Sequence, residues 1–322
     1  MAAAPMLTVG VDVGGTKVLG LAVDERGTVV AEARQPTPSG EEAILARIVD
    51  VAHEVIGSAA AGEVAAVGVG MPGLVDKRGV LRFAPNLPGV VEVDLRAGLS
   101  PKFPDVDLIL DNDATCAGVA EWAHGAARGT TDSIFVGLGT GIGGGMVMGG
   151  QVFRGANGFA GEIGHMVVDP HGPPCPCGKR GCWERFASGS ALGRFGREAA
   201  EGGRAPRLVE LAGGDPEAVR GEHVVTAATD GDEAACAVIA QFGWWLAVGL
   251  ANLANVFDPE LFVLGGGLVA AGDLLFASAR ASFADLVEAH EHRPAIGIVA
   301  AELGEYAGAI GAAVLARGAR SR

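Results

Sequence analysis

One histidine and three cysteines are spaced along residues 161–184 in a way that could hold a metal ion. His165 is followed by Cys175, Cys177 and Cys182 in the stretch GEIGHMVVDPHGPPCPCGKRGCWE. Zn²⁺ binds four such ligands in a tetrahedron, and a set of three thiolates and one imidazole leaves no open position. The alternative is a disulfide with a spare thiol, but C-x-C pairs bridge poorly and the chain looks intracellular. The spacing therefore predicts a structural zinc site.

Two carboxylates flank these ligands. Glu162 lies three residues before His165, and Glu184 lies two residues after Cys182. A metal that fixes this loop also fixes the directions of both carboxylates. The second ring nitrogen of His165 can still donate to a bound group. We therefore expect zinc to build a polar binding site without acting as its catalyst.

Glycine-rich turns follow three expected strands. Residues 7–13 and 133–139 each form a strand that leads into a turn and a returning strand. The turn residues are Gly14, Gly15, Thr16 and Lys17 in the first hairpin, and Thr140 and Gly141 in the second. Backbone N–H groups of such hairpins can face a phosphate, and Asp12 could hold a hydrated Mg²⁺. One such turn by itself is better explained by an ordinary hairpin, but two of them indicate two related α/β halves, each offering a phosphate loop.

The third glycine run, 265–267, lies between an expected strand and a helix. Glycines in such a place let a flat or anionic ligand approach the backbone closely. After two phosphate hairpins, Gly266 and Gly267 become a plausible shelf for a nucleotide base or ribose.

A carboxylate with catalytic potential ends the expected strand 107–110. The strand leads into Asp111, Asn112 and Asp113, and a helical run follows. A carboxylate at a strand end is well placed for general-base work. Such residues also serve as helix N-caps, which explains at least one of the two aspartates. We assign the cap to Asp111 or Asn112 and the chemistry to Asp113.

The remaining pattern indicates an α/β protein. Ser39 and Glu42 predict a capping box for an amphipathic helix, and a long helix is expected over about 230–256. The polar residues 201–222 are expected to form a surface excursion. The loops at 71–73 and 83–89 could be ordinary turns or could face a sugar.

Composition limits the possible partners. The chain has 322 residues, enough for two domains, with 49% apolar residues and 52 glycines. A net charge of −14 argues against nucleic acid or an anionic membrane as partner. The first basic residue is Lys17, so no signal peptide is expected, and no unbroken apolar run suits a membrane span. We expect a soluble, cytoplasmic protein.

Taken together, these residues resemble the ROK family of sugar kinases, within the actin/hexokinase superfamily. The resemblance covers nearly the whole chain. The matching motifs are VDVGGTK (11–17), DNDA (111–114), GLGTGIGGG (137–145), GEIGH (161–165), CPCGKRGCWE (175–184) and VLGGGL (263–268). Within the family, APNLPG (84–89) and the residues after Cys182 look most like the glucokinase branch. Trp183 and Phe186 stand where that branch more often has Leu and Tyr.

The resemblance implies two actin-like (ribonuclease-H-like) α/β domains, each on a mixed five-stranded sheet, with the active site in the cleft between them. Residues 1–112 plus about 304–322 would form the smaller N-terminal domain. Residues 113–303 would form the larger domain, which carries the zinc motif.

The resemblance also implies roles for the site residues. Asp113 would be the catalytic base, and Asn112 a ligand of a sugar hydroxyl. The other expected sugar ligands are Glu162, His165 and Glu184. The expected surroundings of the ATP phosphates are Gly14, Gly15, Thr16, Lys17, Thr140 and Gly141, with Gly266 and Gly267 beside the adenosine. His165 and the three cysteines would hold zinc.

The implied reaction is ATP- and Mg²⁺-dependent transfer of phosphate to the 6-hydroxyl of glucose, by an enzyme that is commonly a homodimer or homotetramer. The nearest alternative is a kinase of N-acetylmannosamine, N-acetylglucosamine, allose or fructose. A sugar-responsive repressor would carry an N-terminal helix-turn-helix, whereas the first hairpin here starts within a dozen residues. A non-catalytic sugar sensor is the third alternative, and the retained Asp113 argues against it. The donor could also be polyphosphate.

Overall fold

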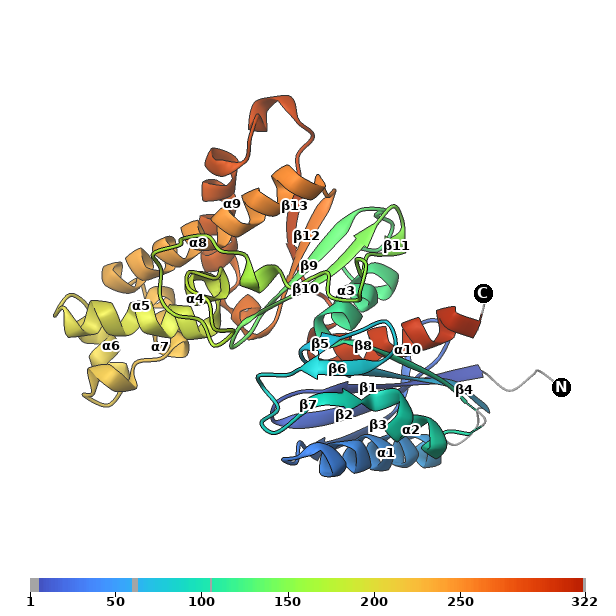
Figure 1. The fold of residues 1–322 in the computed structure, drawn as a ribbon. Coiled ribbons are helices and arrows are strands. Elements are labelled where there is room, and N and C mark those ends of the chain that lie inside the picture. The colour runs from blue at the N-terminus through green and yellow to red at the C-terminus, as the bar shows by residue number, and fades with distance from the viewer. Residues whose placement is uncertain (1–5, 60–62, 105, 321–322) are drawn as a thin grey trace. The chain divides into compact units, whose positions relative to one another are not determined.

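The computed structural model describes residues 6–59, 63–104 and 106–320 (Figure 1). The chain divides into two compact units. The first comprises Met1–Phe135, Gly144–Gly161 and Glu302–Arg322, and the second comprises Val136–Gly143 and Glu162–Ala301. The first unit extends past the expected boundary at residue 112, because α3 (Asp113–His124) packs on the C-terminal helix α10 (Ala307–Arg320).

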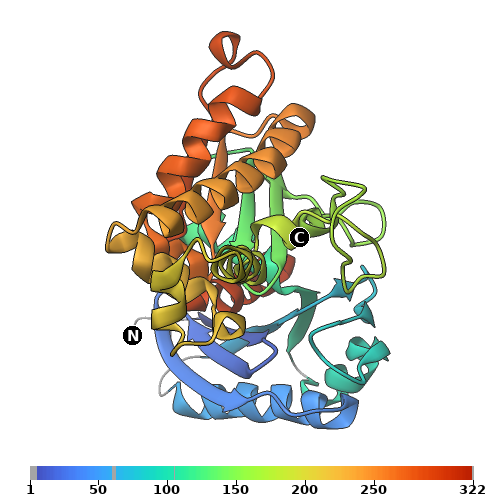
Figure 2. The same cartoon turned by 90° about the vertical axis from the view of Figure 1, so that its left-hand side faces the viewer.

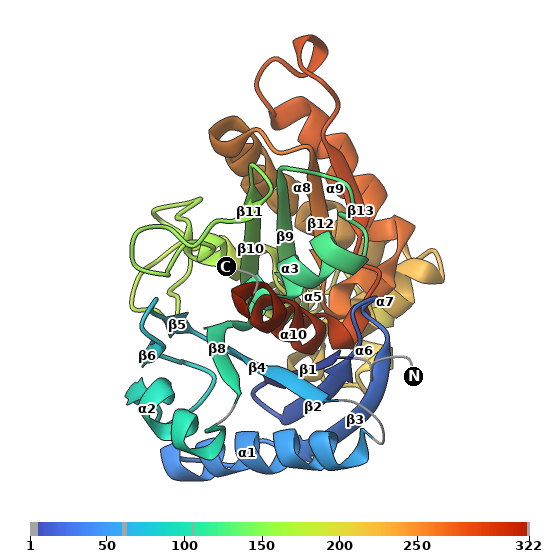
Figure 3. The ribbon, with the colours of Figure 1, turned by 90° about the vertical axis from the view of Figure 1, so that its right-hand side faces the viewer.

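A five-stranded mixed sheet forms the centre of the first unit, in the order β3-β2-β1-β4-β8. Its strands are β1 (Met6–Val13), β2 (Lys17–Val23), β3 (Val29–Pro36), β4 (Glu63–Met71) and β8 (Asp107–Asn112). β1, β2 and β3 pair antiparallel, whereas β4 pairs parallel with both β1 and β8. α1 (Glu41–Ser58) and α10 cover opposite faces of this sheet (Figure 3). Both faces are therefore buried, which explains the continuous apolar runs of β1 and β4.

The start of α1 differs from the sequence expectation. The helix begins at Glu41, its N-cap is Gly40, and no side chain caps it, so the predicted capping box of Ser39 and Glu42 is wrong. The apolar face is as expected: Ile44, Ile48, Val51 and Val55 are all buried. Packing of that face on the sheet, rather than the cap, therefore holds the helix.

A small antiparallel sheet lies in the segment between β4 and β8. It consists of β5 (Leu74–Val75), β6 (Val80–Phe83) and β7 (Val91–Asp94), followed by α2 (Leu95–Leu99) and the 3₁₀ turn η1 (Ser100–Lys102). The two loops that could face a sugar, 71–73 and 83–89, flank strands of this sheet.

The second five-stranded sheet has the order β11-β10-β9-β12-β13. Its strands are β9 (Ser133–Leu138), β10 (Ile142–Met148), β11 (Gln151–Val152), β12 (Leu261–Gly265) and β13 (Gly297–Ala300). β12 and β13 pair parallel, and β10 and β11 pair antiparallel. The strand–turn–strand arrangement of β9 and β10 repeats that of β1 and β2, as the sequence predicted.

The second unit contains most of the helices. They are α4 (Glu184–Ala187), α5 (Gly189–Glu201), α6 (Pro206–Leu211), α7 (Gly221–Thr229), α8 (Glu233–Phe257) and α9 (Asp273–Leu286), with short 3₁₀ turns η2 to η5 between elements. α8 and α9 pack side by side (Figure 2, orange). The expected surface excursion over 201–222 is wrong in part, because α6 lies within it and buries Leu208. Pro206 at the start of α6 supplies the helical φ angle that begins it.

α8 is long and apolar enough to cross a membrane by length and composition, and no other helix of the described residues is. More than half of its most apolar window is buried inside the protein. Phe186 stacks on Trp245 of α8 with ring centroids 4.1 Å apart, and Trp183 donates from Nε1 to the carbonyl of Trp245. This burial is typical of a core helix in a globular protein.

Candidate functional site

The predicted zinc ligands lie together in the second unit. One ligand atom from each of His165, Cys175, Cys177 and Cys182 lies within 4.8 Å of the other three. The Sγ atoms of Cys177 and Cys182 are 3.6 Å apart, and Cys175 Sγ lies 3.8 Å from His165 Nδ1. In a tetrahedron with Zn–S bonds of about 2.3 Å, neighbouring ligand atoms are about 3.5–3.8 Å apart. The four side chains therefore fit Zn²⁺ with little rearrangement.

The loop that presents these ligands is closed by its own backbone. His165 ends the 3₁₀ turn η2 (Ile163–His165), and Val167 bridges Cys182. Gly181 has φ +68°, and a Cβ there would lie 1.5 Å from the carbonyl oxygen of Asp169. Only glycine fits at this position, so the chain can fold back closely enough to bring Cys182 to the other ligands.

The two flanking carboxylates point at this cluster from different sides. Glu162 Oε2 lies 3.7 Å from His165 Nε2, while Glu184 Oε1 lies 3.0 Å from Cys175 Sγ. Glu184 Oε2 fills the space where a Cβ on Gly141 would stand, 2.5 Å away. Burial raises the pKa of Glu162, which His165 opposes and Glu184 reinforces. Since His165 Nδ1 faces the thiols, its Nε2 faces Glu162 and stays available to a ligand.

The second and third glycine turns meet at the end of β9. The Thr140 carbonyl accepts from the Ser190 hydroxyl at 2.8 Å, which joins this turn to the start of α5. Gly266 has φ +86°, and a Cβ there would lie 2.4 Å from the carbonyl oxygen of Leu138. Gly267 follows it as the first residue of η4 (Gly267–Ala271). Thr140, Gly141 and Gly266 are thus gathered at one edge of the second sheet.

The first glycine turn, between β1 and β2, lies in the first unit. Thr37 fixes it, donating from its hydroxyl to the Gly14 carbonyl at 2.6 Å and from its amide to Thr16 at 3.1 Å. A Cβ on Gly15 would lie 3.6 Å from the carbonyl oxygen of Asn86. The loop that contains Asn86 therefore borders the turn that is predicted to surround phosphate.

Two charged residues of this turn have partners that the sequence did not indicate. Lys17 pairs with Glu305, which also pairs with Arg34 at 3.0 Å. Burial raises the pKa of Asp12 to about 6, and Lys17 opposes that shift. The start of α10 closes over Asp12, since a Cβ on Gly308 would lie 2.5 Å from its carboxyl carbon. No local signal connects Lys17 to Glu305, which lies 288 residues away.

The structure resolves which residue caps α3. Asn112 is the N-cap and accepts from the Thr115 amide at 2.9 Å, and Asp113 is the first helical residue. Asn112 Nδ2 donates both to the Gly73 carbonyl at 3.1 Å and to Asp113 Oδ1 at 3.0 Å. Asp111 is not the cap: one of its oxygens accepts the Asn112 amide, also at 2.9 Å. The side chains of Asn112 and Asp113 are therefore positioned by the strand end and by loop 71–73.

Asp12 lies near the end of β1, and Asp113 directly follows the end of β8 in the same sheet. Gly70 of β4 is paired with Asp12 of β1 on one side and with Asp111 of β8 on the other. A Cβ on Gly70 would lie 3.4 Å from the Asp113 Cα and 3.6 Å from Asp12 Oδ1. Because β1, β4 and β8 are parallel, their carboxyl ends meet at one edge, where α/β proteins bind ligands. Gly70 therefore lies beside both the Asp12 carboxylate and the backbone of Asp113, with the Cys116 Sγ 3.3 Å from the same Cβ position.

Comparison with known proteins places this arrangement in context. The ROK family profile matches residues 8–319. The chain is 39% identical to a glucokinase of Streptomyces coelicolor, over 97% of this chain and 98% of the relative, and 36% identical to a glucokinase of Thermotoga maritima, over 95% of each. Among solved structures, a ROK family glucokinase of Streptomyces griseus in complex with glucose and AMPPNP matches with a TM-score of 0.85 and 38% identity, over 97% and 99% of the chains. More distant relatives include an N-acetylmannosamine kinase of Escherichia fergusonii (32% identical, 97% of this chain and 99% of the relative) and a xylose repressor of Bacillus subtilis (30% identical, 87% and 69%).

Proposed function

The chain belongs to the ROK family and is an ATP-dependent hexose kinase, and we propose that it phosphorylates glucose on the 6-hydroxyl with Asp113 as the general base. The observation that carries the base assignment is the position of Asp113 at the start of α3, directly after β8, where Asn112 Nδ2 donates to its Oδ1 at 3.0 Å. Asp12 of β1 lies at the same carboxyl edge of the first sheet. Asp12 would hold the metal ion that binds the phosphates, and Asp113 would accept the proton of the attacking hydroxyl.

The phosphoryl transfer depends chiefly on position and charge. Asp113 accepts the proton of the 6-hydroxyl as that oxygen attacks the γ-phosphorus in line. Amides of the two glycine–threonine turns bind the phosphate oxygens, and Lys17 exchanges its pairing with Glu305 for the phosphates. Mg²⁺, which Asp12 would hold through water, supplies neutralisation of charge on the phosphates.

The proposed sugar ligands are Asn112, Glu162, His165 and Glu184. Carboxylates that accept from sugar hydroxyls give specificity, because a missing or inverted hydroxyl leaves a buried acceptor unpaired. His165 would hold structural zinc through Nδ1, which lies beside the thiols, and would bind the sugar through Nε2. Gly266 and Gly267 border the adenosine. A cytoplasmic location and a homodimer or homotetramer complete the proposal.

The deciding experiment measures ADP release with Mg-ATP and a panel of hexoses. We expect strong turnover on glucose, and a fall in kcat of about 10²- to 10⁴-fold in Asp113→Asn with glucose binding retained. Asp50→Asn, on the exposed face of α1, is the matched control and should leave kcat unchanged.

Other results would revise the proposal in defined ways. Preferred turnover on N-acetylmannosamine would keep the mechanism and replace the substrate. Near-normal turnover in Asp113→Asn would remove Asp113 from the role of base. Binding of glucose without turnover on any hexose would favour a sugar sensor.

A further inference from the structure

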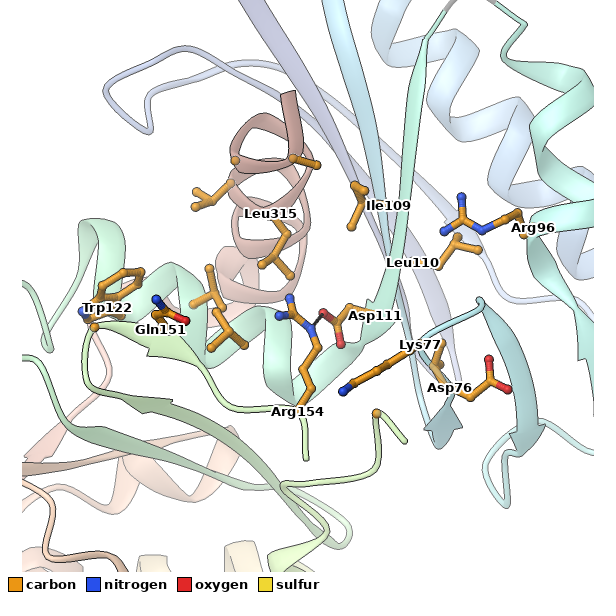
Figure 4. A pocket seen from close by; sticks show the side chains of 18 residues that line it. Asp76, Lys77, Arg96, Ile109, Leu110, Asp111, Trp122, Gln151, Arg154 and Leu315 are labelled. Atoms are coloured by element: carbon orange, nitrogen blue, oxygen red, sulfur yellow. Dashed lines mark hydrogen bonds and ion pairs between the residues drawn. The ribbon is translucent and has the colours of Figure 1, made fainter. Parts of the chain in front are cut away.

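We propose that Asp111 and Arg154 act as a positioning pair, which holds Asn112 and Asp113 in their catalytic geometry; this inference rests on the proposed function. Asp111 is only 6% exposed, one of three charged residues buried within the described part of the chain. Its Oδ2 accepts from Arg154 Nε at 2.7 Å (Figure 4). A buried carboxylate is costly unless it is paired and hydrogen-bonded, so the position of Asp111 depends on Arg154.

The other oxygen of Asp111 connects this ion pair to the predicted site. Asp111 Oδ1 accepts the backbone N–H of Asn112 at 2.9 Å. β8 is an edge strand, so one row of its amides has no neighbouring strand to bind. The carboxylate therefore replaces a missing strand partner at the last residue before α3.

From Asn112 the hydrogen bonds continue to the general base. The Asn112 side chain caps α3 and donates to Asp113 Oδ1 at 3.0 Å. Asp113 Oδ1 also accepts the amide of Ala114 at 2.7 Å. An uninterrupted series of contacts thus runs from the Arg154 guanidinium through Asp111 and Asn112 to Asp113. A shift of Asp111 would displace both residues that are proposed to contact the reacting hydroxyl.

Arg154 is held by backbone contacts of its own segment. Its carbonyl accepts the Ala160 amide at 3.2 Å, and the neighbouring Phe153 amide donates to the Met146 carbonyl at 2.9 Å. The Asn157 carbonyl accepts the Lys77 amide at 3.1 Å, which joins this segment to the β5–β6 turn. Backbone hydrogen bonds therefore fix the segment that carries Arg154. Its guanidinium can in turn fix the position of the end of β8.

The pair faces a cavity of about 550 Å³, which gives the experiment access to it. The cavity lies between β8, the segment after β11 and α10, and Lys77, Trp122 and Leu315 also line it (Figure 4). Arg154 is one-third exposed there. Removal of the Arg154 side chain would leave a path by which a small cation could reach Asp111 from solution.

The test measures kcat and KM in Arg154→Ala, with and without added guanidinium ion. We expect kcat on glucose to fall at least tenfold while KM for ATP changes less than twofold. Guanidinium below about 50 mM, too dilute to unfold the protein, should restore a large part of kcat. Arg154→Lys keeps the charge without the planar donor geometry, so its kcat should lie between those of the wild type and Arg154→Ala. Lys77→Ala, which removes another cation from the same cavity, should keep wild-type kcat and show no response to guanidinium.

Several outcomes would overturn the pair. The proposal is wrong if kcat in Arg154→Ala stays within twofold of wild type. It is also wrong if kcat falls only in proportion to the folded fraction of the protein and does not respond to guanidinium. If Arg154→Ala does not fold, Arg154→Lys decides: wild-type kcat in that variant refutes the requirement for the arginine geometry. The wild-type enzyme is measured in the same assay. If it phosphorylates no hexose, the proposed function fails by itself, and the pair is judged by whether Arg154→Lys weakens glucose binding in calorimetry.

Discussion

The two carboxylate oxygens of Glu184 contact two different parts of the proposed site, the predicted zinc ligands and the second glycine turn. One oxygen lies 3.0 Å from Cys175 Sγ, and the other occupies the space beside Gly141. The residues proposed to bind sugar and a turn proposed to bind phosphate therefore meet at a single carboxylate in the second unit. As a zinc ligand, Cys175 would be a thiolate without a proton to donate to Glu184, and that carboxylate oxygen would then be available to a sugar hydroxyl.

The first prediction concerns zinc at the residue scale. The purified protein should contain one zinc per chain, and Cys177→Ser should lose most of it, because three ligands bind zinc much more weakly than four. Glucose KM should then rise about 10- to 100-fold, since the ligand loop also orients Glu162 and Glu184. Metal analysis and kinetics check both results. Cys236→Ser, in α8 and outside the cluster, is the control; equal zinc content in the two variants would refute the site.

At the scale of elements, the β5–β6 hairpin supports the site from the side of Asn112. Its turn is organised by Asp76, which accepts the amides of Arg78 at 2.9 Å and Val80 at 3.0 Å and pairs with Arg82 at 2.8 Å. Burial is the largest single influence and raises the pKa of Asp76, but the Val80 amide, the Arg82 guanidinium and the Arg78 amide together hold that pKa down to about 2. Gly73, just before β5, accepts from Asn112. The hairpin thus holds the loop that positions a proposed sugar ligand.

Asp76 makes this hairpin a source of pH-dependent stability. Its folded-state pKa is below the ordinary value, so the stabilisation is complete above about pH 4 and is lost as pH falls toward 2. Asp76→Asn should lower the free energy of unfolding by about 1–2 kcal/mol at pH 7, and the difference should shrink by about half at pH 3. Urea unfolding at the two pH values measures it. Asp50→Asn should show no such trend, and a pH-independent loss in Asp76→Asn would contradict the explanation.

At the scale of the whole chain, the C-terminal helix completes a unit that begins at the N-terminus. α10 packs on β1, β4, β8 and α3. A Cβ on Gly68 of β4 would lie 1.9 Å from the carbonyl oxygen of Ala312, and one on Gly311 would lie 1.7 Å from that of Cys116 in α3. Glycine at these positions allows the close approach. The start of α3, which carries Asp113, is therefore held by the last helix of the chain.

Two glycines of α10 give a matched test of this contact. Gly311→Ala should lower the free energy of unfolding by about 1–3 kcal/mol and reduce kcat, because α3 and α10 must move apart. Gly318→Ala, in the same helix with nothing within 4 Å of the added Cβ, should raise it by about 0.4–1 kcal/mol. Thermal unfolding and kinetics measure both. Similar shifts in the two variants would show that helix propensity, rather than close packing, governs this site.

The features that the sequence predicted correctly are local ones. The strand–turn–strand hairpins, the buried face of α1 and the ligand spacing around Cys175 each depend on residues within a few positions of one another. Periodicity and spacing within one element record which face is buried and which side chains converge. The family resemblance extended these local patterns to a fold class, which the structure confirms as mixed α/β on two five-stranded sheets.

Only the tertiary structure decided which residues position the site. It selected Asn112 over Asp111 as the cap, paired Asp111 with Arg154 and Lys17 with Glu305, and required glycine at 311. It also replaced the expected capping box of α1 with an uncapped glycine and added a helix within 201–222. The two ion pairs join residues that are 43 and 288 positions apart in the chain. Such contacts leave no periodic pattern in the chain, because they are fixed by how whole elements pack and not by the order of neighbouring residues.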